Sequence, residues 1–274
     1  MTEVRWQRSD DRRRTTEVGS GTRRGPIGRD SGAGACGSLN FMKILAVDTA
    51  TKSCSVAVVD GNSLLAESTT VNCQTHSRHL LNSIDTVIGK AGLIISQVDG
   101  FAVSIGPGSF TGLRIGITTI KGLAFSLNRP VVGVSSLETL AFQCKQSPYL
   151  ICPAIDARKH EIYFCHYRYQ NGKLKKDGPE RVASPAAALR DIREHCVFVG
   201  NGAKLYQKLI SSELGDLAHF VAESQHTLQA AAVARLSLSR FKRQETDDVH
   251  LLVPHYIRQS DAQLKIGVDN TLKS

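Results

Sequence analysis

The sequence has few of the features that mark metal-binding, secreted or membrane-spanning proteins. Seven cysteines are present, but none forms a Cys-x-x-Cys pair and several lie in apolar runs. We therefore expect buried free thiols in a reducing compartment rather than disulfides or a zinc site. No stretch approaches the roughly 18 apolar residues of a membrane span. The reducing compartment indicates a cytoplasmic protein. No Ser/His/Asp or Cys/His catalytic grouping can be argued from the spacing.

Positive charge is unevenly distributed along the 274 residues, whose net charge is +9. Residues 1–41 contain eight arginines and five acidic residues, are rich in Gly, Ser and Thr, and show almost no apolar periodicity. We expect a disordered extension here, and an arginine-rich RNA-binding arm is the alternative. The mildly basic remainder is compatible with a nucleic-acid partner but is weak support for one.

Apolar patterning from Met42 onward predicts an α/β domain over 42–148. Three strands in a meander are followed by a helix, a strand, a second helix and a short strand. The expected ranges are Met42–Asp48, Cys54–Asp60, Ser63–Thr70, His76–Ala91, Val98–Ser104, Thr111–Leu127 and Pro130–Val134.

A related order recurs over 149–260 in a shorter form, and 261–274 form a tail. The expected strands are Tyr149–Asp156, His160–Tyr169 and Cys196–Val199, and the expected helices are Ser184–His195, Ala203–Ser211 and His226–Phe241. Each half opens on a strand that ends in an aspartate, Asp48 or Asp156. The sequence therefore predicts two related lobes with ligands favoured in the crevice between them.

The densest motif is IGPGSFTGLRIG at 105–116. It lacks the lysine of a phosphate loop, its third glycine is misplaced for a dinucleotide-binding fingerprint, and it has no Gly-x-Ser-x-Gly. A turn at Gly106 and Gly108, with Ser109 or Thr111 capping the next helix, is the simpler interpretation. An anion on the free amides of that helix is compatible with it.

The helix after this turn has glycines at positions 112 and 116, beside Thr119 and away from its apolar stripe. A glycine inside a helix costs about 1 kcal/mol relative to alanine. Close packing would explain two on one face. The neighbour is either a helix of another subunit, which makes Gly112, Gly116 and Thr119 interface candidates, or a segment of the same chain.

Two further groups are candidates for chemistry. Asp48 and Thr49 close the first strand, where an aspartate could hold a hydrated magnesium ion near a nucleotide, although Ala50 and Thr51 stand where glycines would be expected. A solvated acid at the strand end is the alternative. His76 and His79 lie three residues apart without a third ligand, so we expect no metal site.

Three motifs in order resemble the TsaB (YeaZ) family: KILAVDTAT at 43–51, CSVAV at 54–58 and GPGSFTGLRIG at 106–116. Weaker landmarks are GVSSL at 133–137, IDAR at 155–158 and PHYIR at 254–258, so the resemblance covers 42–260. It implies a two-lobed actin/Hsp70/sugar-kinase fold with a shortened second lobe. The implied role is in forming N6-threonylcarbamoyladenosine (t6A) at position 37 of ANN-decoding tRNAs.

In that family the catalytic subunit is the paralogue TsaD, TsaB is its non-catalytic partner, and the ATPase TsaE joins them. The two helices of the first lobe are the family's pairing surface, for homodimers and for the TsaB–TsaD pair. This implies a partner interface formed by His76, His79, Leu80, Gly112, Arg114, Gly116 and Thr119.

The resemblance implies no intrinsic cofactor, but ADP or ATP at the junction with the partner, tRNA contact through the complex, and no membrane. Candidate nucleotide contacts are Asp48, Thr49, Gly106, Gly108, Ser109 and Thr111. The catalytic paralogue carries His-x-x-x-His on its first helix, and His76-Ser-Arg-His79 departs from that pattern. The alternative function is a nucleotide hydrolase of the same fold or an M22-type metallopeptidase.

Overall fold

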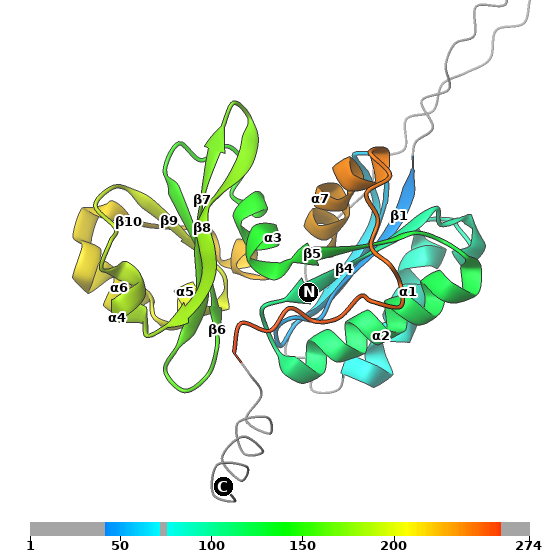
Figure 1. Ribbon diagram of the computed structural model, residues 1–274, viewed down its shortest axis with the longest axis horizontal. Coiled ribbons are helices and arrows are strands. Elements are labelled where there is room, and N and C mark those ends of the chain that lie inside the picture. Colours follow the sequence, from blue (N-terminus) through cyan, green and yellow to red (C-terminus); the bar gives the residue numbers. More distant parts are fainter. Residues whose placement is uncertain (1–41, 72–75, 259–274) are drawn as a thin grey trace, which may run out of the picture. The chain divides into compact units, whose positions relative to one another are not determined.

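Two five-stranded sheets with the same connectivity form the fold of the computed structural model, which describes residues 42–71 and 76–258 (Figure 1). The first sheet has the order β3-β2-β1-β4-β5 and the second β10-β9-β6-β7-β8. In each, the central strand pairs antiparallel with the next strand of the chain and parallel with the fourth. The predicted pair of related α/β lobes is confirmed, and this duplicated topology is that of the actin/Hsp70/sugar-kinase fold.

The first sheet and its helices agree closely with the sequence prediction. Alternating side chains of its strands enter two separate cores, as the period of two requires. The helices α1 and α2 cover one face, and α7 covers the other (Figure 1). The elements are β1 (Lys43–Asp48), β2 (Cys54–Asp60), β3 (Ser63–Thr70), α1 (His76–Lys90), β4 (Gly100–Gly106), α2 (Phe110–Leu127), β5 (Val131–Ser135) and α7 (Ala230–Lys242).

The second sheet is complete, so the shortening expected of this lobe lies in its helices. Helices α4, α5 and α6 pack on one face and α3 on the other. Cys152, Cys165 and Cys196 are buried free thiols, as expected. The elements are α3 (Ser136–Gln143), β6 (Leu150–Asp156), β7 (Ile162–Gln170), β8 (Lys173–Ala183), α4 (Pro185–Leu189), β9 (Cys196–Val199), α5 (Asn201–Leu205), α6 (Gln207–Leu214) and β10 (Ala218–Phe220), with 3-10 turns at Ile95–Gln97, Gly215–Leu217 and Glu223–His226.

Some expectations for the second half are wrong. The helix predicted at Ser184–His195 ends at Leu189, and the one predicted at His226–Phe241 is a 3-10 turn followed by α7. Because α7 packs on β1, β2, β4 and β5, residues 149–260 do not form a lobe by themselves. The predicted extension 1–41 and tail 261–274 lie outside the described residues.

After α7 the chain returns along the first lobe (Figure 1). We call residues 247–258 the strap. It begins where the Asp247 amide donates to Val131 O on the edge strand β5 at 2.9 Å. Lys121 of α2 then donates to the carbonyls of His250 and Leu252 at 3.0 and 3.2 Å. No regular element of the strap was predicted from sequence.

Candidate functional site: a strand-end turn and the α2 surface

The carboxylate that ends the first strand lies inside the protein. Asp48 and Thr49 are completely buried. Burial raises the pKa of Asp48 to about 6, while the Ser104 side chain and the Ala50 amide, which donates to Oδ1 at 3.4 Å, act in the opposite direction. Within the described residues Oδ2 has no hydrogen-bond partner, and Ser104 Oγ lacks a hydrogen bond of standard geometry. The solvated strand-end acid considered from sequence is therefore wrong.

The Gly-Pro-Gly turn packs directly on the segment that follows Asp48. A Cβ atom on Gly108 would lie 2.3 Å from Ala50 O, and the Ser109 amide donates to that oxygen at 2.7 Å. Gly106 has a φ of +116°, which glycine adopts without the strain of an L side chain. The close backbone approach that glycine allows at a phosphate site is thus made here to the chain itself.

The glycines of α2 have an intramolecular neighbour. A Cβ on Gly112 would lie 2.1 Å from Thr49 O, and one on Gly116 would lie 2.3 Å from Thr49 Oγ1. The Thr49 hydroxyl also donates to Gly112 O at 2.8 Å. These glycines let α2 approach the end of β1, so the inference from them to a helix of another subunit is wrong.

The structure brings the six candidate nucleotide contacts together at the ends of β1 and β4 and the start of α2, but they differ in exposure. Ser109 and Thr111 are exposed, and Ser109 Oγ caps α2 by accepting from the Gly112 amide at 3.2 Å. Gly108 is half-buried, whereas Asp48, Thr49 and Gly106 are buried.

The interface candidates divide in the same way. Leu80 is completely buried in the core under α1, and Gly112 and Gly116 are buried under α2, so none of these presents a surface for a partner. Arg114 and His79 are exposed and Thr119 is half-buried. The side chain of His76 lies outside the described residues.

Two different helical glycines face open space. A Cβ on Gly89 of α1 or Gly122 of α2 would meet no atom within 4 Å. On the same two helices, Leu81 of α1 is 56% exposed and Phe125 of α2 is 66% exposed. Because a helical glycine costs about 1 kcal/mol relative to alanine, these two positions are unexplained by the chain's own packing.

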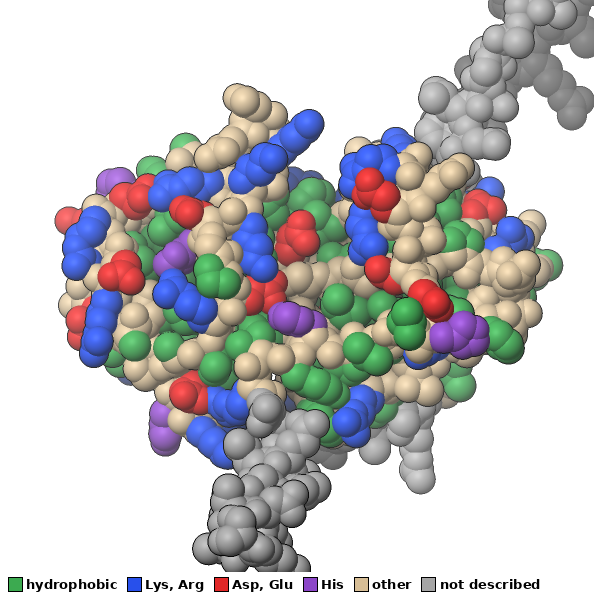
Figure 2. Space-filling view, in the orientation of Figure 1, with side chains coloured by type: hydrophobic (Ala, Val, Ile, Leu, Met, Phe, Trp, Pro, Cys, Tyr) green, Lys and Arg blue, Asp and Glu red, His purple; other side chains and the backbone are tan. Residues whose placement is uncertain are grey.

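The strap continues this surface. The ring of Tyr256 stacks on Phe110 with centroids 5.0 Å apart, and its hydroxyl accepts from Arg114 Nε at 3.0 Å. The Arg114 guanidinium lies 3.7 Å from the centre of the Phe110 ring. Figure 2 shows hydrophobic side chains at the surface along α2 and the strap. The PHYIR motif was a sequence signal for this segment, but it did not indicate where the segment packs.

At its far end the strap reaches the turn after β6. The His255 amide donates to Ile105 O at 2.7 Å. Arg258 donates to Ala157 O at 3.1 Å and pairs with Glu161. The strap therefore contacts the end of β4 in the first lobe and the turn after β6 in the second.

Within residues 42–71 and 76–258, no helix is both long and apolar enough to cross a membrane. In the same part of the chain, no three histidine, cysteine or acidic side chains converge as metal ligands do.

Comparison with known proteins gives a consistent family. Residues 64–266 match the family described as TsaD, tRNA N6-adenosine threonylcarbamoyltransferase. The chain is 33% identical to the tRNA threonylcarbamoyladenosine biosynthesis protein TsaB of Bacillus subtilis, with 82% of this chain and 97% of the relative covered. It is 31% identical to the protein of that name in Escherichia coli, with 82% and 98% covered.

Two solved structures from Pseudomonas aeruginosa share the fold. YeaZ matches with a TM-score of 0.67 at 29% identity, over 78% of this chain and 99% of that one. A protein described as similar to peptidase YeaZ matches with a TM-score of 0.67 at 30% identity, over 79% and 100%. Together with the sequence relatives, these matches show that the chain belongs to the TsaB family of tRNA threonylcarbamoyladenosine biosynthesis proteins.

Proposed function

We propose that this chain is the non-catalytic partner subunit needed for t6A formation at position 37 of ANN-decoding tRNAs. It binds a TsaD-like catalytic paralogue, and a TsaE-like ATPase joins the pair. In isolation the chain forms a homodimer through the same face, in the cytoplasm. Its family acts in t6A biosynthesis, which supports the pathway. Which subunit carries out the chemistry has to be inferred from the site.

The observation that carries the proposal is the close packing of the Gly-Pro-Gly turn and α2 against the residues that follow Asp48. An enzyme of this fold needs backbone at the strand ends to approach a phosphate closely. Here Gly108 and Gly112 place that backbone against Ala50 and Thr49, with gaps that a single Cβ would close. Asp48 behind them is fully buried. This packing supports chemistry on another chain.

The pairing face is the outer surface of α1 and α2. Exposed apolar groups occur on these helices, Leu81 on α1 and Phe125 on α2, and Gly89 and Gly122, which lack side chains, leave room for the backbone of a second helix pair. A partner that fills this room would account for two helix-weakening residues at solvent-facing positions. Aromatic and arginine side chains such as Phe125 and Arg114 are enriched in protein interfaces.

A nucleotide, where one binds, would lie at the junction with the partner rather than inside this chain. Ser109 and Thr111, at the exposed start of α2, are the candidate contacts that remain accessible. The tRNA is then contacted through the assembled complex.

Co-purification with the catalytic paralogue tests the proposal, with Gly122→Leu as the variant. Leucine is a better helix former than glycine, and its Cβ atom would meet no atom of this chain within 4 Å, so the variant should be at least as stable as the wild type. It should nevertheless reduce the amount of co-purified paralogue at least tenfold, because its side chain occupies the space of the partner helix.

The matched control is Ser211→Leu, which adds the same side chain at an exposed position of α6 in the second lobe. It should leave pairing unchanged. Undiminished pairing of the folded Gly122→Leu variant would show that the interface lies elsewhere.

A second candidate function, hydrolysis of a nucleotide or a peptide by this chain, rests on Asp48. A buried carboxyl group with a pKa of about 6 and one oxygen without a partner has the properties of a general base. The purified chain would then hydrolyse ATP or a peptide by itself, and Asp48→Asn would stop it. If the isolated, folded chain hydrolysed neither ATP nor a peptide, this second function would be excluded.

A further inference from the structure

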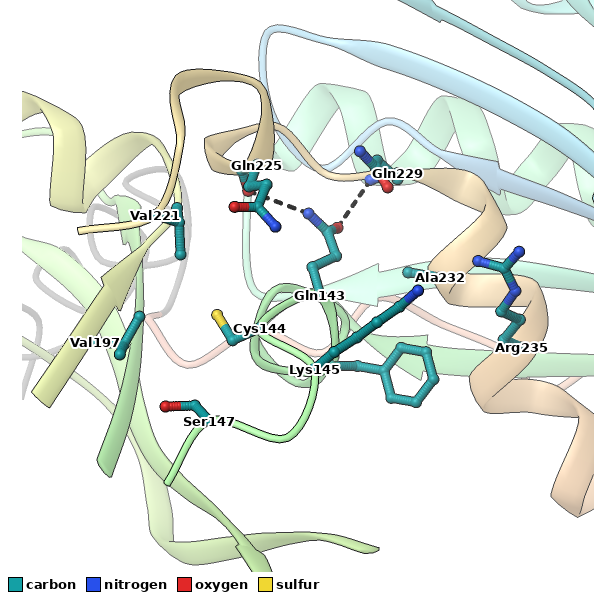
Figure 3. Close-up of a pocket in the computed structure, with 11 residues that line it drawn as sticks. Gln143, Cys144, Lys145, Ser147, Val197, Val221, Gln225, Gln229, Ala232 and Arg235 are labelled. Atoms are coloured by element: carbon teal, nitrogen blue, oxygen red, sulfur yellow. Dashed lines mark hydrogen bonds between the residues drawn. The ribbon is translucent and has the colours of Figure 1, made fainter. Parts of the chain in front are cut away.

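A cavity of about 380 Å³ lies on a different part of the molecule from the strand-end turn (Figure 3). It is lined by the end of α3 and the residues that follow it, by Val197 of β9, by the segment around Val221 and Gln225, and by α7. Its volume is within the range of about 300–1,000 Å³ that is typical of ligand pockets.

One wall of this cavity is held in place by a single side chain. Gln143, the last residue of α3, is almost completely buried. Its Nε2 donates to Gln225 O at 3.1 Å, and its Oε1 accepts from the Gln229 amide at 3.0 Å (Figure 3). The same Nε2 also donates to Thr227 O at 3.0 Å. The amide is thus fully used, so the cavity is a preformed feature of the fold rather than a gap between loose loops.

The charged side chains that line the cavity are both cationic. Lys145 makes no hydrogen bond or ion pair within the described residues, and Arg235 makes only a 3.5 Å contact from Nε to Asn62 O. Figure 3 shows their charged ends directed to the same part of the cavity. Glu67 accepts from the Ala231 amide near this end of α7, but it does not line the cavity.

The remaining lining neither neutralises these charges nor adds to them. Burial raises the pKa of the Cys144 thiol to about 12, so it stays neutral at physiological pH. Gln225 accepts from the Ala222 amide at 3.2 Å through Oε1, which leaves its amide hydrogens without a partner in the described chain. Val197 and Val221 form an apolar end opposite the cations (Figure 3).

From this arrangement we propose that the cavity binds a small phosphate monoester of about the size of a nucleoside monophosphate. The phosphate lies between Lys145 and Arg235, and the organic part covers Val197 and Val221. Two cations with no acidic neighbour in the lining match the charge of about −1.5 to −2 that a phosphate monoester carries near neutral pH better than the single charge of a carboxylate. The planar guanidinium of Arg235 provides paired donors for phosphate oxygens.

Isothermal titration calorimetry of the full chain with adenosine 5′-monophosphate tests the proposal. Binding should be detectable below 1 mM ligand. Arg235→Gln and Lys145→Gln should each weaken it about tenfold or more, because each removes a charge-assisted contact. The control Lys208→Gln removes an exposed lysine of α6 that does not line the cavity, and it should bind like the wild type.

Three outcomes would overturn the proposal. The first is no binding at 1 mM by the folded wild type. The second is equal binding by wild type, Arg235→Gln and Lys145→Gln, which would place the ligand at another site. The third is equal affinity for adenosine or for inorganic phosphate, which would mean that the phosphate or the organic part makes no contact.

Discussion

The two lobes use the same topology but treat the acid at the end of their first strand differently. Asp48 of β1 is completely buried with one carboxylate oxygen without a partner. The side chain of Asp156 of β6 is 19% exposed, accepts from the Arg158 amide at 2.9 Å and lies 3.9 Å from the Arg158 guanidinium. Duplication therefore repeated the strand order without repeating the chemistry of the turn.

What the two turns share is a glycine pressed against the first strand or its end. A Cβ on Gly108 would lie 2.3 Å from Ala50 O, and one on Gly200 would lie 2.4 Å from Ala154 O. In both lobes the helix that follows holds a further glycine close to the strand, Gly112 at Thr49 and Gly202 at Ile155, but only in the first lobe is that helix long, and there Thr49 and Asp48 are completely buried. The comparison shows how a turn suited to ligand binding becomes a packing contact.

The largest expected effect is on this packing contact. Gly112→Ala places a Cβ atom 2.1 Å from a backbone oxygen that cannot rotate away, so it should destabilise the chain by about 3 kcal/mol or more. Gly122→Ala on the same helix meets nothing and should stabilise the chain by about 0.5–1 kcal/mol. Urea unfolding of both variants measures the difference, and equal stabilities would contradict the assignment of the two glycine faces.

The second effect concerns the two aspartates. Because the native pKa of Asp48, about 6, lies above its ordinary 3.8, the native state binds the proton more tightly than the unfolded chain between these values. The stabilisation from this proton is fully present below the ordinary value and is lost as the pH rises through about 6. Asp48→Asn should therefore be more stable than the wild type by about 3 kcal/mol at pH 8.

The same comparison at pH 5 should give a smaller gain for Asp48→Asn. Asp156→Asn is the control in the other lobe, and it should change stability by less than about 1 kcal/mol at either pH because its ion pair is partly exposed. Unfolding curves at the two pH values test this. A pH-independent difference for Asp48→Asn would mean that the pKa of Asp48 in the native state is not raised above its ordinary value.

The smallest effect is on the strap, which joins the two turns. Tyr256→Ala removes the stack on Phe110 and the hydrogen bond from Arg114, and it should cost about 1 kcal/mol. Amide hydrogen exchange is the local measurement, because the His255 amide donates to Ile105 O. Exchange at His255 should accelerate while that of β1 amides such as Leu45 stays slow. Unchanged exchange at His255 would show that Tyr256 does not hold the strap.

Local patterns were sufficient to predict most of the first lobe. Alternation and a Gly-Asn turn gave β2 and β3 with their observed bounds, and the 3.6-residue stripe gave α2 to within one residue. The elements of the second lobe were harder to predict because its apolar residues follow a less regular pattern. The strand β8 is largely exposed and rich in charge, so it has no apolar alternation to detect.

The site was predicted less well, for a physical reason. A glycine in a helix indicates that another group packs closely, but the sequence does not identify that group. Gly112 and Gly116 were therefore listed as partner contacts, whereas the structure places Thr49 against them. Leu80 belonged to an apolar helical face, and its depth depends on tertiary packing. The path of the strap depends on contacts such as Arg114 with Tyr256, which are 142 residues apart in sequence.

Reconstitution of tRNA modification tests the central claim most directly. An unmodified ANN-decoding tRNA is incubated with the substrates, the TsaD-like paralogue and the TsaE-like ATPase of the same genome, with and without this chain, and t6A is measured in the digested tRNA. The account predicts t6A only when this chain is present, none when this chain acts alone, and much less with Gly122→Leu in its place. Full modification without the chain, or modification by the chain alone, would contradict its role as an accessory subunit.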